Sequence, residues 1–350
     1  MNKTLNVLVL AAALMAASPA HSLAAKGSKA AKTSRQIVLQ KEAGMRSITE
    51  NAARAHVGFL ADDLLEGRRA GERGSRIAKQ YIISQIREAG LKPFLGDSYE
   101  LPFEAVAVQK LKRGVRFFVD ADSVAEIKKG VYQRMELSNV MCVLPGKKSD
   151  ELVVVGAHLD HEGMYADVAG DNIYNGADDN ASGVSAVLQI MKAFTVSGAQ
   201  PERTIVFAFW DGEEQGLLGS RYFTQNYDHM ERVKGYLNFD MVGSGTDSKY
   251  LMYFFTASHP ALGEWLKSDM AAYGFTTFAP DYRSWDNPIG GSDQSSFHLK
   301  GVPIVWYHTG GQPHYNQPSD EAQTINYPKL TDITRASYLT TWHLANEKDY

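Results

Sequence analysis

Histidine and carboxylate side chains follow several apolar segments in the central part of the chain. They are His158, Asp160 and His161; Asp178 and Asp179; Glu213 and Glu214; and Asp240. One strand end with acidic residues is ordinary, because such residues cap helices and fill loops. Four such strand ends in succession instead indicate a functional site. Histidine and carboxylate ligands without cysteine suit hydrolytic zinc, manganese or cobalt centres, and a bridging carboxylate allows two ions.

The segments that must position these side chains alternate between two apolar patterns. Short runs predict strands at residues 114–119, 139–144, 152–157, 204–210, 236–239, 251–255 and 304–307. Helical spacing predicts helices at 48–65 and 75–89, and again around 184–194. This alternation is typical of an α/β sheet with parallel strands and helices on both faces. Ligands of such sheets bind at the carboxyl ends of the strands, where the acidic and imidazole residues follow.

Composition excludes several classes of protein. The 350 residues are 44% hydrophobic and 22% charged, which is the balance of a globular protein with a sizeable core. The net charge of −4 and the absence of a basic stripe argue against nucleic acid as a partner. The one cysteine, Cys142, excludes an internal disulfide and a zinc site built from cysteines.

The N-terminal segment has the pattern of a secretory signal peptide. Lys3 precedes the apolar run Leu5–Ala17, which is shorter than the roughly 20 residues of a membrane span. We therefore expect a signal peptide at 1–20, a flexible leader at 21–47, and one catalytic domain at 48–350. This division predicts export to the periplasm or the medium, with no membrane span in the mature chain.

The central motifs resemble peptidase family M28, the metallo-aminopeptidases. The matching stretches are 156–161 (GAHLDH), 175–183 (NGADDNASG), 209–216 (FWDGEEQG) and 238–242 (NFDMV). Each motif alone is weak evidence, but the ordered series is specific. The resemblance implies a three-layer zinc exopeptidase fold of the phosphorylase/hydrolase type, with a mixed central sheet and helices on both faces. A complete protease-associated insert, found in some relatives, is not expected, because the segment 91–138 is too short to hold one.

The resemblance also implies the metal ligands. It assigns His158 and Asp240 to one ion and Glu214 to the other, with Asp179 bridging the two. The implied cofactor is zinc, two ions per chain, with cobalt or manganese as possible substitutes.

Two further residues take implied roles beside the metals. Glu213 is the expected general base, and Asp160 is expected to hold the His158 imidazole in one tautomer. By contrast, His161 is expected to be a loop residue or a partner of a ligand, and Asp178 to be structural.

The sequence departs from the family pattern near its C-terminus. The family carries its fifth ligand, a histidine, four residues before an aspartate, and Asn316 stands there before Asp320. Imidazole is a far better zinc ligand than an amide, so a nearby histidine is expected to replace it. Gly310 and Gly311 precede His314, and a two-residue shift of this loop would bring His314 to the site. We therefore expect His314 to join Asp179 and Glu214.

The expected reaction is removal of N-terminal residues from peptides with a free N-terminus. Two ions about 3.5–4 Å apart would acidify a water molecule and polarise the scissile carbonyl. The loops at 282–292 and 302–308 are expected to line the side-chain pocket with the aromatic residues Tyr282, Trp285, Trp306 and Tyr307. A glutaminyl cyclase that uses one zinc, or a binding module without activity, remains an alternative. The oligomeric state is open.

Overall fold

The apolar runs of the central region pair into one sheet. The computed structural model describes residues 20–108, 115–167, 169–245, 248–287 and 290–350, with side chains from residue 34 onward. Within these residues, the nine strands of the sheet are β1 (Lys92–Pro93), β2 (Glu100–Val108), β3 (Tyr132–Leu144), β4 (Lys148–His158), β7 (Arg203–Trp210), β8 (Val233–Phe239), β9 (Tyr250–Thr256), β10 (Ala279–Trp285) and β11 (Ile304–His308). Two short strands, β5 (Gly163–Met164) and β6 (Ile173–Tyr174), form a separate pair.

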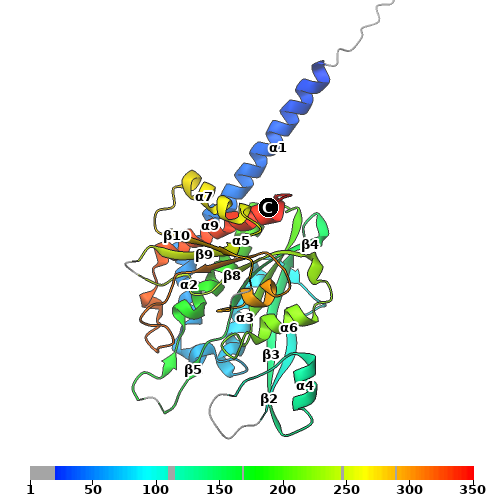
Figure 1. The fold of residues 1–350 in the computed structure, drawn as a ribbon. Coiled ribbons are helices and arrows are strands. Elements are labelled where there is room, and N and C mark those ends of the chain that lie inside the picture. Colours follow the sequence, from blue (N-terminus) through cyan, green and yellow to red (C-terminus); the bar gives the residue numbers. More distant parts are fainter. Residues whose placement is uncertain (1–19, 109–114, 168, 246–247, 288–289) are drawn as a thin grey trace, which may run out of the picture.

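Helices precede, connect and follow these strands (Figure 1). The α-helices are α1 (Ala20–Ser47), α2 (Glu50–Leu60), α3 (Arg73–Glu88), α4 (Ala121–Ile127), α5 (Gly183–Ser197), α6 (Leu218–Asn226), α7 (Ala261–Tyr273), α8 (Gln294–His298) and α9 (Tyr327–Asn346). Shorter helical turns are η1 (Asp63–Arg68), η2 (Ala177–Ser182), η3 (Met230–Arg232) and η4 (Ala322–Thr324). The mixed α/β architecture predicted from the sequence is confirmed.

The central strands of the sheet are parallel, so the strand ends that precede the acidic and imidazole residues lie at one edge of the sheet. The strand order is β1-β3-β7-β4-β8-β11-β9-β10, with β2 paired to β3. Strands β7, β4, β8 and β11 run parallel to one another, whereas β3 and β9 flank them in the antiparallel direction. The carboxyl ends of the four central strands therefore meet at the same edge.

Both faces of the sheet are covered, as the continuous apolar runs require. Along β4, Val153 and Val155 point into the core cluster that contains α5 and α9 residues. Their neighbours Leu152 and Val154 point to the other face and join Phe223 of α6 and Phe297 of α8. A strand buried on both sides leaves only its ends free for chemistry.

Two expectations about local structure are corrected. Residues 21–47, expected to be a flexible leader, belong instead to helix α1, which extends away from the sheet in Figure 1. The end of this helix packs closely on α5 and α9, since a Cβ at Gly44 would lie 2.6 Å from the Ala193 carbonyl oxygen. The strand expected at 114–119 is reduced, in the part described, to one bridge between Phe118 and Val106.

The expected signal peptide lies outside the described residues, except for Ala20. Within the part of the chain that is described, no helix combines the length and apolar character needed to cross a membrane. The limits of the domain at 48–350 stay a prediction.

Candidate metal centre

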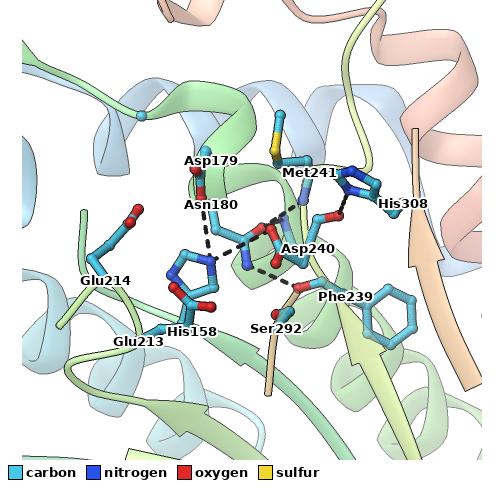
Figure 2. Close-up of polar contacts among 12 residues, drawn as sticks. His158, Asp179, Asn180, Glu213, Glu214, Phe239, Asp240, Met241, Ser292 and His308 are labelled. Atoms are coloured by element: carbon cyan, nitrogen blue, oxygen red, sulfur yellow. Dashed lines mark hydrogen bonds and ion pairs between the residues drawn. The ribbon is translucent and has the colours of Figure 1, made fainter. Parts of the chain in front are cut away.

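Three parallel strands deliver the acidic and imidazole side chains to one place (Figure 2). His158 is the last residue of β4, while Glu213 and Glu214 follow β7 and Asp240 follows β8. Asp179 reaches the same place from the turn η2, which precedes α5. The structure thus brings together four of the five expected metal ligands and the expected base.

The first group of potential ligands is centred on the His158 imidazole. Its Nε2 atom lies 3.3 Å from Oδ1 of Asp179 and 3.5 Å from Oδ1 of Asp240. Zinc binds nitrogen and oxygen ligands at about 2.0–2.2 Å, so two ligand atoms of a tetrahedral ion lie about 3.4 Å apart. These two distances match that spacing, and the three side chains are buried.

A second group lies on the other side of Asp179. The Oε1 atom of Glu214 lies 2.8 Å from Nδ1 of His161, and the same nitrogen lies 3.9 Å from Oδ2 of Asp179. Asp179 therefore turns one oxygen toward each imidazole, which is the arrangement of a bridging carboxylate. His161, expected to lie outside the ligand set, has its side chain inside this group.

Glu213 faces the space between the carboxylates. It forms a third cluster with His158 and Glu214 and lines the same cavity as Asp179 and Asp240. Adjacent residues of one turn thus present two carboxylates to the site.

Asp160 holds that turn in place. Its carboxylate accepts hydrogen bonds from the backbone N–H groups of Glu213, at 3.1 Å, and Glu214, at 3.3 Å. Its contact with His158 is made chiefly by its carbonyl oxygen, 3.2 Å from Nδ1, while its carboxylate lies 3.9 Å from that nitrogen. Asp160 positions the two glutamates as well as the imidazole.

The turn that carries Asp179 is fixed by a residue from far along the chain. The carboxylate of Asp320 accepts hydrogen bonds from the backbone N–H groups of Asp178 and Asp179, at 3.0 Å each. Gly176 begins the turn at φ +59°, where a Cβ would lie 2.1 Å from the Asp179 carbonyl oxygen. Asp178 faces away, accepting a bond from the Gly243 N–H, and so has the structural role expected of it.

A buried arginine, which the sequence analysis did not single out, joins the loops beneath the centre. The Arg68 guanidinium is 1% exposed and donates to the carbonyl oxygens of Leu60, Leu159, Asn175 and Gly176. It thereby ties the segment after β4 to the segment before η2. Its sequence signal is the stretch 60–68 (LADDLLEGR), which resembles the family more weakly than the four central motifs do.

The electrostatics of the cluster fit a bound cation. Burial raises the pKa of Asp179, of Glu213 and, to about 7, of Glu214, and the neighbouring carboxylates raise these values further. Carboxylates gathered away from water favour either protons or a metal ion over free negative charge. The residues present therefore fit a metal site made of oxygen and nitrogen ligands.

The carboxylates open into a cavity of about 270 Å³. Besides the acidic residues, its walls include Met241, Gly291, Trp306, His308 and Tyr315. Of the expected aromatic residues, Trp306 lines it, whereas Tyr282, Trp285 and Tyr307 do not. Tyr315 was missed; burial, aided by the carboxylates, raises its pKa to about 12, so its hydroxyl stays a proton donor at neutral pH.

His314 does not join the cluster, contrary to expectation. Its Nδ1 atom lies 2.9 Å from the Ser319 hydroxyl, and its side chain lines a separate cavity beside Asp178. The expected shift of the glycine-rich loop does not occur, because the His314 N–H is bonded to the Gln312 side chain. His308 is a cavity residue as expected, with Nδ1 2.8 Å from the carbonyl oxygen of Asp240.

Comparison with known proteins places this geometry in a family. The model of peptidase family M28 matches residues 139–341, a span that contains β4, β7, β8 and every residue of the three clusters. The chain belongs to peptidase family M28. The family resemblance read from the sequence is thereby confirmed.

Curated M28-like relatives are matched over part of their length. The chain is 31% identical over 187 residues to leupeptin-inactivating enzyme 1 of Streptomyces exfoliatus, covering 53% of this chain and 38% of that protein. It is 31% identical over 206 residues to a probable leucine aminopeptidase of Arthroderma otae, covering 55% of this chain and 54% of that protein. The matched region thus spans about two fifths and about half of these relatives.

Solved structures show the same fold at low sequence identity. An aminopeptidase of Aneurinibacillus sp. strain AM-1 superposes with a TM-score of 0.64 at 16% identity, covering 88% of this chain and 97% of that one. A glutaminyl cyclase of Macrostomum lignano gives a TM-score of 0.63 at 20% identity, covering 86% of this chain and 91% of that one. The M28 fold is therefore shared by proteins named for two different reactions.

Proposed function

We propose that this chain is a zinc-dependent aminopeptidase with two metal ions in its centre. The observation that carries the proposal is the orientation of the Asp179 carboxylate. Its Oδ1 atom faces the group of ligands around His158, and its Oδ2 atom faces the group around His161. The chain's relatives that are named as aminopeptidases support the same proposal.

The ligands divide between two sites. His158, Asp179 and Asp240 would hold one ion, and Asp179 and Glu214 the other. Bound metal supplies Lewis acidity, which polarises the scissile carbonyl and lowers the pKa of water. The absence of cysteine ligands leaves cobalt and manganese as substitutes for zinc.

Glu213 is placed to move the proton that peptide hydrolysis requires. Its carboxylate takes a proton from the attacking water as the new C–O bond forms. It then gives this proton to the amine nitrogen as the C–N bond breaks. A carboxylate whose pKa is raised by burial is a stronger base than an exposed one, which suits this role.

The position of the proposed ions in the cavity supports selection of a free amino terminus. The cavity is lined by the metal-ligating Glu214 and Asp240, so a free α-amine of the substrate would lie beside the metal centre and be held by one ion and neighbouring acidic groups. Trp306 and Met241 give part of the wall an apolar character, which favours a hydrophobic first residue.

A substrate comparison tests the proposed reaction. We expect the metal-loaded protein to release p-nitroaniline from leucine p-nitroanilide and to leave acetyl-leucine p-nitroanilide uncut, because acetylation removes the free α-amine. A peptide with N-terminal glutamine should be shortened, with release of free glutamine. Loss of ammonia with formation of pyroglutamate would instead identify a glutaminyl cyclase, and no reaction on any of these substrates would favour a binding module.

We also propose that the protein is exported. Support comes from the apolar run Leu5–Ala17 and the small residues that follow it. The N-terminal sequence of the protein recovered from the periplasm or medium tests this; a chain that retains Met1 in the cytoplasm would contradict it.

A further inference from the structure

The second group of ligands needs more than two carboxylates. Catalytic zinc sites use three protein ligands and leave a position open for water or substrate. Asp179 and Glu214 each offer one oxygen to the second group, so a third side chain must complete it. Four candidates lie near the centre: His161, His308, His314 and Asn316.

We infer that His161 is the third ligand of the second metal ion, bound through Nδ1. This inference rests on the proposed two-metal centre and names the residue that completes it. The Nδ1 atom lies 2.8 Å from Oε1 of Glu214 and 3.9 Å from Oδ2 of Asp179. One of these distances is shorter and the other longer than the roughly 3.4 Å expected between two ligands of one tetrahedral zinc ion, so small shifts of the side chains would bring both to that spacing.

The imidazole of His161 is held rigidly in this position. The side chain is fully buried, and its ring lies against the backbone of Gly176, where a Cβ would approach Cγ to 2.6 Å. The backbone N–H of His161 bonds to the carbonyl oxygen of Arg68 at 3.3 Å. A ligand fixed before the metal arrives loses little conformational entropy on binding.

Neither His308 nor His314 belongs to a group of potential ligand atoms in the described residues. His314 contacts the Ser319 hydroxyl and lines a different cavity. His308 contacts the carbonyl oxygen of Asp240 through Nδ1. Asn316 is not among the residues that line the cavity of the carboxylates.

A purely structural role predicts something different. If His161 only donated a hydrogen bond to Glu214, it would orient that carboxylate without binding metal. The two roles differ in the number of imidazoles bound to zinc, which X-ray absorption at the zinc edge measures directly. With about two zinc ions per chain, His158 and His161 together give a mean of about one imidazole per zinc, whereas His158 alone gives about one half.

The test combines this measurement with zinc content in three proteins. In the wild type we expect about two zinc ions per chain and about one imidazole per zinc. His161→Gln, which retains a hydrogen-bond donor, should keep the first ion and bind the second more than about 100-fold more weakly, since even partners of metal ligands contribute 10–100-fold to affinity. His314→Gln is the matched control and should keep both ions. Retention of the first zinc by His161→Gln, with an unchanged circular dichroism spectrum, shows that the variant is folded.

Each contrary result has a distinct meaning. Two tightly bound ions in His161→Gln, or about half an imidazole per zinc in the wild type, would overturn the assignment of His161 and leave the two-metal centre intact. Loss of the second ion in His314→Gln alone would transfer the role to His314. A single ion in the wild type would overturn the two-metal centre and this inference together. If His161→Gln fails to fold, the wild-type imidazole count together with the zinc content of His308→Gln and His314→Gln still decides the question.

Discussion

Replacing Glu213 by glutamine should lower kcat by about 10²–10⁴-fold while the zinc content stays that of the wild type. Glutamine keeps the shape of the side chain but has no basic carboxylate to take the proton of the attacking water. The metal ligands are untouched, because Glu213 is not in the two groups that contain Asp179. Steady-state hydrolysis of leucine p-nitroanilide and elemental analysis of the same sample measure both quantities.

A nearby glutamate provides the matched control for this substitution. Glu162 acts electrostatically on Glu214 and bonds to the Tyr165 hydroxyl, but it does not line the cavity. Glu162→Gln makes the same chemical change at the edge of the site and should leave kcat within about twofold. Loss of zinc from Glu213→Gln would show that the roles of Glu213 and Glu214 are exchanged.

Asp179→Asn should remove most of the activity and weaken both metal sites at once. The two carboxylate oxygens of Asp179 face two different groups of ligands, one near His158 and the other near His161. The amide of asparagine has only one oxygen and no charge, so it cannot bind both metal ions. Zinc content after dialysis should fall below one ion per chain.

Asp240→Asn separates this effect from general damage to the centre. Asp240 contacts the first group alone, so its amide variant should lose one ion and keep the other. Equal zinc loss in the two variants would contradict a bridging role for Asp179.

The ligands on the central strands were predictable from the sequence because each follows a buried apolar run directly. His158 ends β4, and Asp240 comes just after β8, so the parallel sheet alone brings them together. The general base was predictable only through the family resemblance, since the sequence does not say which of two adjacent glutamates faces the water.

Side chains placed by contacts between distant segments were not predictable. His161 turns toward Glu214 because a bridge to Arg69 sets the path of the chain after β4. Asp320 reaches the backbone of Asp179 across 141 positions of sequence. Neither contact leaves a periodic pattern that a single sequence reveals.

Two wrong expectations have a different origin. His314 was assigned from an assumed loop register, but local bonds to Gln312 and Ser319 decide where its ring lies. The segment 21–47 was read as flexible from its composition, although alanine and lysine also favour helices, and the packing of Gly44 anchors its end.

Zinc titration of the metal-free protein tests the central claim most directly. The protein is stripped with a chelator, and leucine p-nitroanilide hydrolysis is followed while zinc is added in known amounts. We predict no activity in the metal-free protein, recovery as zinc is taken up, and a plateau at about two ions per chain. Full activity in chelator, with elemental analysis confirming that metal is absent, would contradict the account.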